Sequence, residues 1–322
     1  MRRAAVAAAA ACVAIPGAAY ETDQVTNRGV PIADSTAVLN ARVNETIAGI
    51  AADWEGGRDE WAFVSAIYHE IGGHHWVDRL ERWAMRSDEV EKLPVPRYGS
   101  ILSGHPPWAT RVTKLFGVGD TILLNGQFVG SDKIGHFLSQ GRKFYKRWRR
   151  YGSEAKAAER SAYTERAIFG RMTTGAYSNA DLVANYEGHR FYRSLFEDDI
   201  VPGKPAILRW EGGGWVVQRA FDWADHVNEY WDEALNVNHY DALLYPHMRR
   251  RLLEFCPQYW ERPELYSIAN EERLIEKYAQ LGLRNTRELR LDSLCPVQVF
   301  LETGEVGAVR AGILSRGVPA FP

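Results

Sequence analysis

The spacing of apolar positions along the chain predicts helices in its N-terminal third. Residues 33–54 repeat apolar side chains at helical intervals, and Ser35 or Asp34 is available to cap the first turn. A second helical stretch ends before Gly72 and Gly73, which interrupt the pattern. The predicted helices of this part span residues 33–54, 60–69 and 76–86.

The same periodicity predicts a helical centre and a helical C-terminal half. The densest pattern lies between Ser131 and Phe196, which we interpret as three helices. The remaining predicted helices cover residues 222–235, 245–255 and 269–283.

Two short segments favour β-hairpins instead. TILLNGQFVG (residues 121–130) contains Asn-Gly, a common two-residue turn, and LRWEGGGWVVQ (208–218) has a glycine-rich centre. The proline-rich bend at 202–205 is the only candidate for an internal boundary, and we favour one domain. The sequence therefore predicts a mainly α fold, with a single helical domain over residues 20–322 and one or two small β-hairpins.

Residues 1–19 have the three parts of a secretory signal peptide. Arg2 and Arg3 supply the positive end, a short apolar stretch follows, and small residues up to Ala19 offer a cleavage site. An Ala-rich helix of the fold and a lipid anchor on Cys12 are the alternatives. We expect export to the periplasm or secretion.

Cleavage there would leave two cysteines, Cys256 and Cys295. In an oxidising compartment we expect them to form a disulfide that ties down the C-terminal helical half. Two unpaired buried thiols are the alternative.

The amino-acid composition limits the classes of partner that the chain is expected to bind. Loss of Arg2 and Arg3 would change the formal charge from -2 to -4, so the chain as a whole has no net positive charge to attract nucleic acid or anionic membranes. No later run of 18 apolar residues predicts a membrane span. The chain has 11 Trp and 15 Tyr, which suit sugar stacking, although we assign most of them to the core.

Candidate chemistry gathers in the three central helices. In the first, Asp132 and His136 are four residues apart and can touch on one face, either for function or as an end charge beside a packed imidazole. In the second, Glu165 falls inside an apolar stripe, where burial would raise its pKa and prepare a general acid. A structural salt bridge is the alternative for Glu165. The stripe consists of Ala155, Ala158, Ala162, Phe169 and Met172.

The third central helix begins with Ser178 and Asp181 at the spacing of a capping box. Ser178, Asp181, Asn185 and Tyr192 fall on one face, and Gly188 leaves space beside them. Capping accounts for the first two residues but not for the rest of this polar stripe, which we interpret as a cleft wall.

These segments resemble a known family. GSDKIGHFLSQGRKFY, TERAIFG and TTGAYSNADLVANYEGHRFYRSLF together are similar to the deacetylation-specific lysozyme group of predatory bacteria, over about a fifth of the chain. The resemblance implies a lysozyme-like fold and glycosidase action on peptidoglycan glycan strands, including glycan whose glucosamine lacks its acetyl group. Glu165 matches the position of the superfamily's catalytic acid.

The resulting hypothesis is an exported peptidoglycan glycoside hydrolase that needs no cofactor. Glu165 donates the proton, and Asp181 stabilises the positive sugar or activates water. Asp181 or Glu187 could also select a charged glucosamine amine. The expected substrate-binding residues are Lys133, His136, Tyr177, Ser178, Asn185, Glu187 and Tyr192.

Two other functions remain open. One is a non-catalytic binding protein of the cell envelope. The other is a metal-dependent hydrolase built on His69, Glu70, His74, His75 and Asp78, whose spacing departs from His-Glu-x-x-His because Gly73 stands in place of the second histidine. The sequence does not set the oligomeric state.

Overall fold

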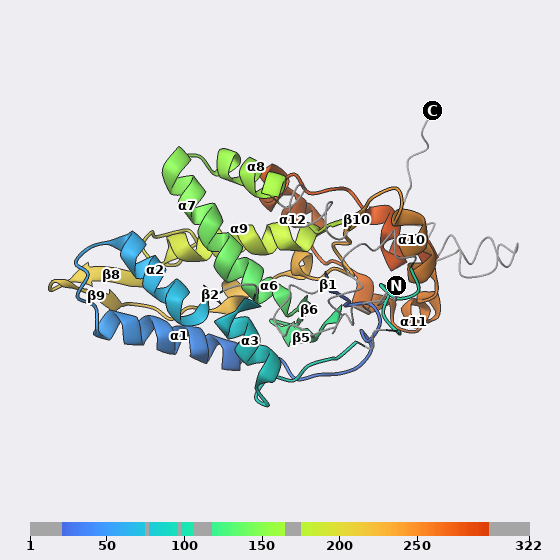
Figure 1. The fold of residues 1–322 in the computed structure, drawn as a ribbon, viewed down its shortest axis with the longest axis horizontal. Coiled ribbons are helices and arrows are strands. Elements are labelled where there is room, and N and C mark those ends of the chain that lie inside the picture. The colour runs from blue at the N-terminus through green and yellow to red at the C-terminus, as the bar shows by residue number, and fades with distance from the viewer. Residues whose placement is uncertain (1–20, 75–76, 96–97, 106–117, 165–174, 296–322) are drawn as a thin grey trace, which may run out of the picture.

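The computed structural model describes residues 21–74, 77–95, 98–105, 118–164 and 175–295. These residues form the mainly α fold that the periodicity predicts, with short two-stranded sheets between the helices (Figure 1). Helices α1 and α2 lie at one end of the molecule with the β8–β9 hairpin, and α10 and α11 lie at the other (Figure 1). The predicted signal peptide lies outside the described residues.

The N-terminal helices match the predicted ones, with one shifted start. The third helix begins at Arg79 because Gly73–His74 (β2) and Val77–Asp78 (β3) pair as a small antiparallel sheet. A Cβ on Gly73 would lie 2.3 Å from Asp78 Oδ1, so only glycine fits this turn. The helices are α1 (Thr36–Ala52), α2 (Glu60–Ile71) and α3 (Arg79–Arg86).

The first central helix is interrupted by a π-helical turn. It runs as α6 (Asp132–Gly135), a π segment (His136–Gln140) and α7 (Gly141–Tyr151). Tyr192 Oη donates a hydrogen bond to the carbonyl oxygen of Leu138 (3.0 Å), which lies within the π segment. Single π turns of this kind often mark functional sites.

Helices α8 (Glu154–Thr164) and α9 (Asn179–Ser194) complete the central part. Helix α9 is buried along most of its length and packs closely on α7. A Cβ on Gly141 would lie 2.6 Å from the Cα of Gly188, so the two backbones are in contact through their glycines.

Both predicted hairpins are confirmed. Strands β5 (Thr121–Leu124) and β6 (Gln127–Gly130) pair around Asn125 and Gly126, which have positive φ as a type I′ turn requires. Strands β8 (Leu208–Glu211) and β9 (Gly214–Val217) form the other hairpin. The remaining strand pairs join distant segments: β1 (Glu21–Thr22) with β4 (Val118–Gly119), and β7 (Ala176–Tyr177) with β10 (His239–Tyr240).

The prediction of a helix at 222–235 is wrong. The segment contains only two 3₁₀ turns, Trp223–Asp225 and Glu229–Trp231. The side chains of Asp222 and Asn228 accept hydrogen bonds from backbone N–H groups two residues later. Such local bonds compete with the helical ladder and favour turns.

The C-terminal part consists of short helices. The predicted helix at 269–283 is split, because its regular part ends at Lys277 and a 3₁₀ turn follows. The elements are α10 (Tyr245–Leu253), α11 (Cys256–Glu261), α12 (Glu271–Lys277) and the 3₁₀ turns Pro263–Tyr266, Ala279–Leu281 and Arg287–Leu289.

The core consists of two main apolar clusters. The larger one surrounds α9 and includes Leu195 and Ile207, which flank the proline-rich bend at 202–205. The second cluster lies at the C-terminal end and contains Met248 and both cysteines. Among the described helices, none is long and apolar enough to cross a membrane.

The predicted disulfide is confirmed between Cys256 and Cys295, whose Cα atoms lie 5.2 Å apart. It closes a loop with a sequence separation of 39 residues and lies in the buried C-terminal cluster. The bond therefore ties the start of α11 to the last described segment of the chain.

Loss of this disulfide should lower the free energy of unfolding by about 4 kcal/mol, because the unfolded chain regains the entropy of the closed loop. Urea unfolding of a Cys256→Ser/Cys295→Ser variant would measure the loss. Reductant should destabilise only the natural protein and leave the variant unchanged. Equal midpoints for variant and natural protein would contradict the prediction.

A methyl group at Gly188 should destabilise the fold by about 3 kcal/mol or more, because overpacking here meets backbone. A Cβ at this position would lie 1.9 Å from the carbonyl oxygen of Phe137. Thermal or urea unfolding of Gly188→Ala measures the effect. The matched control is Gly49→Ala in α1, where a Cβ meets nothing within 4 Å and a small gain is expected.

Candidate functional site

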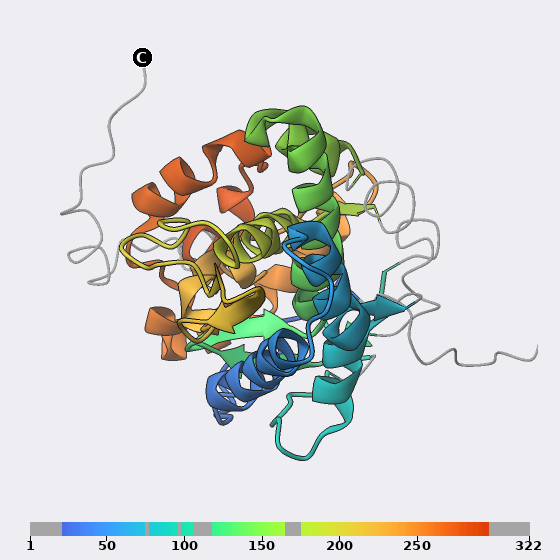
Figure 2. The same cartoon turned by 90° about the vertical axis from the view of Figure 1, so that its left-hand side faces the viewer.

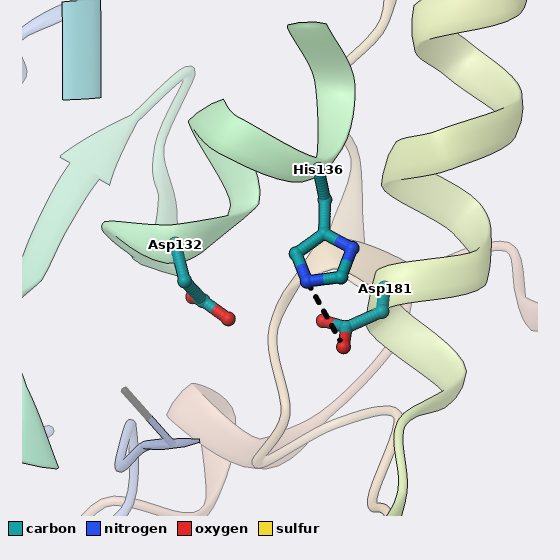
Figure 3. A group of neighbouring side chains, drawn as sticks. All are labelled: Asp132, His136 and Asp181. Atoms are coloured by element: carbon teal, nitrogen blue, oxygen red, sulfur yellow. Dashed lines mark ion pairs between the residues drawn. The ribbon is translucent and has the colours of Figure 1, made fainter. Parts of the chain in front are cut away.

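Two helix starts bring the polar residues of the central block together. Asp132 and His136 come from α6 and its π continuation, and Asp181 comes from the first turn of α9 (Figure 3). Ser178 caps α9 by accepting a hydrogen bond from the Asp181 N–H (3.1 Å). The cap uses only the backbone of Asp181, so its carboxylate is free to face α6.

Lys133 lies at the centre of this group. Its side chain is 1% exposed, and Nζ lies 2.7 Å from a carboxylate oxygen of each of Asp132, Asp181 and Glu233. We call these four residues the Lys133 cluster. Burial alone would lower the pKa of Lys133, but the three carboxylates outweigh it and raise that pKa well above its usual value. Lys133 therefore stays charged in the interior.

The three carboxylates of the cluster differ. Burial raises the pKa of Glu233 to about 7 and also raises that of Asp132, in both cases against the opposing charge of Lys133. For Asp181, burial is outweighed by the charges of His136 and Lys133, which lower its pKa. Asp181 is thus the carboxylate held as an anion.

His136 is the member of the site that reaches solvent, with 16% of its side chain exposed. Its Nε2 lies 3.2 Å from Asp181 Oδ2, as Figure 3 shows, and its Nδ1 lies 3.0 Å from Asn185 Oδ1. Asp181 and Asn185 are one turn apart on α9, so a single helix face holds both sides of the imidazole.

A second pair of buried acids lies next to α6. Asp78 accepts a hydrogen bond from Ser139 Oγ (2.6 Å), and burial raises the pKa of Asp78 to about 7. Burial, with the charges of Asp132 and Asp78, raises the pKa of Glu81 well above its usual value. A Cβ on Gly135 would lie 2.4 Å from Glu81 Oε2, so glycine is needed for this approach. Acidic side chains therefore outnumber cationic side chains around the start of α6.

Asp132, His136 and Asp181 can together hold a metal ion. Each offers one ligand atom, and these atoms lie within 4.8 Å of one another (Figure 3). Asp132 Oδ1 is buried and has no hydrogen-bond partner among the described residues. Asp181 Oδ1 lies close to Lys133 Nζ, yet it makes no hydrogen bond of acceptable geometry, so we treat that contact as Coulombic.

The structure places the predicted substrate-binding residues in two groups. Lys133, His136, Ser178 and Asn185 gather around Asp181. Only His136 among them is more than slightly exposed, so the expected direct contact of Lys133 with substrate needs correction. Its ammonium is surrounded by carboxylates instead.

The other predicted residues are structural. Glu187 is fully buried and contacts Lys277, His226 and Tyr278, and these cationic and polar partners lower its pKa to about 2 despite the opposing effect of burial. Tyr177 Oη donates to the carbonyl oxygen of Gly282, and Tyr192 Oη donates within the core. The expectation that Glu187 selects a sugar amine is therefore corrected, because the charge of Glu187 is already paired inside the protein.

Glu165, the predicted catalytic acid, lies outside the described residues. The helix before it buries Ala158 and Ala162 as predicted, whereas Ala155 is exposed. The buried face of α8 also includes Ala157 and Ser161.

The rival histidine cluster is described only in part. His69 is exposed on α2, and Asp78 is buried against Ser139. The side chain of His74 and the whole of His75 lie outside the described residues, so this cluster stays a prediction. The metal-ligand group that is found contains none of the residues of that cluster.

Sequence reasoning missed two acids of the site. The spacing of Asp132 and His136 was a signal whose functional and end-charge interpretations stayed open, and Asp132 was not included among the predicted site residues. Glu233 carried no signal, because the segment around it was predicted as a helix and instead forms turns.

Comparison of the chain with protein-family models, with curated proteins and with solved structures gave no match. The resemblance to the deacetylation-specific lysozymes therefore stays a prediction. The site has to be interpreted from its own geometry.

Asp78→Asn should change how stability depends on pH. The pKa of Asp78 is about 7 when folded and near 4 when unfolded, so the folded state binds more protons between these values. This group therefore makes the natural protein lose stability as pH rises from about 4 to about 7. Asparagine removes that loss, and the stability of the variant relative to the natural protein should rise by about 1 to 4 kcal/mol over this range.

Urea unfolding at a series of pH values measures this effect. The matched control is Asp88→Asn, which changes an exposed carboxylate and should leave the profile parallel to that of the natural protein. Parallel profiles for Asp78→Asn as well would show that Asp78 does not store a proton in the fold.

Proposed function

We propose that this chain is an exported, metal-dependent hydrolase, in which Asp132, His136 and Asp181 bind a divalent cation that activates water. The observation that carries the proposal is the convergence of these three ligands at the junction of α6 and α9. Two carboxylates and an imidazole suit cations such as Zn²⁺ or Mn²⁺.

The hydrogen bonding of His136 supports a cation at Nε2. Its Nδ1 faces Asn185 Oδ1, an acceptor, which places the ring proton on Nδ1. Nε2 then faces a second acceptor, Asp181 Oδ2, at 3.2 Å, so it carries either a proton, which gives the charged imidazole that lowers the pKa of Asp181, or a metal ion. Two acceptors at this distance repel unless a proton or a metal ion lies between them. Neighbouring ligands of one cation, each about 2.1 Å from it, are about 3 Å apart.

The charge of the site supports the same conclusion. Three carboxylates surround the single ammonium group of Lys133, so the cluster would carry two net negative charges if all three acids were ionised. Glu81 adds a further buried acid beside Asp132. A buried surplus of acids must hold protons or bind a cation.

Lys133 is compatible with a metal because it uses only part of each carboxylate. It contacts Asp132 Oδ2 and Asp181 Oδ1, which leaves Asp132 Oδ1 and Asp181 Oδ2 as ligands. In this arrangement Lys133 positions the two acids, and Asn185 orients the imidazole. Such outer partners typically affect metal affinity by a factor of 10 to 100.

A bound cation would lower the pKa of a water molecule so that hydroxide forms near neutral pH. Hydroxide attacks a carbonyl carbon, so the supported reaction is hydrolysis of an amide or ester bond. The disulfide supports an oxidising compartment, and the sequence resemblance makes peptidoglycan the proposed substrate.

Glycoside cleavage by Glu165 is the second candidate function. Glu165 follows Ala158 by seven residues and Ser161 by four, the spacings that place residues on one helical face. Both of those residues are buried in α8. The described part of α8 thus buries the face on which the sequence prediction puts the general acid Glu165.

Metal binding should depend on His136. We expect the purified protein to bind about one equivalent of Zn²⁺ or Mn²⁺ in calorimetry, and His136→Ala to abolish it. Asn185→Ala should weaken affinity roughly 10- to 100-fold. His69→Ala is the matched control, and it should bind like the natural protein. Loss of binding in His69→Ala but not in His136→Ala would overturn the site.

Digestion of purified sacculi separates the two candidate functions. Metal-dependent amide hydrolysis releases new amino groups and is lost in His136→Ala and with chelator. Glycoside cleavage releases new reducing ends and is lost in Glu165→Gln, with or without chelator. Neither product from native or deacetylated sacculi would favour the non-catalytic binding protein.

A further inference from the structure

Helix α7 carries a concentration of positive charge that the rest of the chain lacks. Six of its 11 residues are basic and none is acidic, whereas the whole chain has a formal charge of -2. The basic residues are Arg142, Lys143, Lys146, Arg147, Arg149 and Arg150, which we call the basic face.

The basic residues lie on one side of the helix. At 100° per residue they cover an arc of about 160°, and the buried Phe144 and Tyr145 lie opposite. In Figure 1, helix α7 runs from the middle of the molecule to its upper edge, where it meets α8, and Figure 2 shows the same fold turned by 90°. The basic face is therefore a continuous strip about 16 Å long.

None of these six side chains forms an ion pair with any carboxylate that the structure describes. Arg142 donates to Ser65 Oγ, and Arg147 donates to Thr164 Oγ1, both neutral acceptors. By contrast, Arg193 on α9 contacts both Glu154 and Glu197. The charge of the basic face is thus not matched by an ion pair among the described residues.

This arrangement costs stability. Arg142 with Lys146, Lys143 with Arg147, and Lys146 with Arg150 are like charges one turn apart, which repel on a helix surface. Burial, followed by the charge of Arg147, lowers the pKa of Lys143. A feature that works against the fold in this way requires another reason.

Aromatic rings accompany the basic face. The guanidinium groups of Arg142 and Arg149 lie 4.4 and 5.6 Å from the ring centroid of Trp61. Tyr151, at the end of the helix, is 39% exposed. The apolar side chains Phe144 and Tyr145 are buried, so the helix has no free apolar face to insert into hydrocarbon.

We propose that the basic face of α7 docks the protein on the anionic phospholipid headgroups of a membrane surface, without insertion. Clusters of four to eight basic residues on an amphipathic helix suit such surfaces. Within the basic face, Lys146, Arg149 and Arg150 are exposed and can meet a broad anionic surface together. The disulfide supports an oxidising compartment, where phospholipid is at hand and nucleic acid is not. This inference is independent of the metal site.

Co-sedimentation with vesicles tests the proposal. The full chain should bind vesicles of phosphatidylcholine with about 40% phosphatidylglycerol and not vesicles of phosphatidylcholine alone. Raising the salt from about 0.1 M to about 0.5 M should release it, because screening shortens the range of the attraction. The triple variant Lys146→Glu/Arg149→Glu/Arg150→Glu should bind anionic vesicles at least roughly tenfold more weakly.

The matched control reverses three exposed arginines elsewhere, Arg209→Glu/Arg250→Glu/Arg273→Glu, with the same change in net charge. It should retain binding. Circular dichroism and urea unfolding verify that both variants are folded. Equal loss in the control, equal binding to neutral vesicles, or tighter binding of a soluble polyanion such as poly-glutamate than of vesicles would each overturn membrane docking.

Discussion

The burial of Lys133 is the constraint on which the centre of this protein depends. An ammonium group that is 1% exposed is tolerable only with paired charges, and three carboxylates at 2.7 Å supply them. They come from α6, α9 and the turn segment before β10, so one electrostatic requirement fixes three distant segments. Removal of Lys133 would leave three buried acids without the cation that they share. The same requirement orients Asp181 towards His136.

The contacts that pack the central helices together also place the residues of the site. The close contact of Gly141 with Gly188 brings the π segment against α9, and this places His136 opposite Asp181 and Asn185. A larger side chain at either glycine would separate the helices and with them the ligands. The π segment and the contact of the two glycines thus both determine how His136, Asp181 and Asn185 lie relative to one another. A metal bound there would be held by rigid helices rather than by loops.

Local and long-range signals explain which predictions succeeded. The Asn125-Gly126 turn, the Ser178 cap and the helical periodicity of α1 act over a few residues, so the sequence alone predicted them. The segment at 222–235 failed because Asp222 and Asn228 bond to nearby backbone, which periodicity does not register. Grouping Ser178, Asp181 and Asn185 on one face was also a local inference, and their gathering with His136 agrees with it.

By itself the sequence determined the mainly α class, both hairpins, the pairing of its two later cysteines and the polar face of α9. Each follows from spacing or from the small number of partners available. Only the tertiary structure decided that Lys133 is buried, that Glu187 is an internal ion-pair partner, and that Glu233 joins the site from 100 residues beyond Lys133. Burial and long-range charge pairing depend on how helices pack, and helical periodicity carries no information about which distant acid will compensate a buried cation.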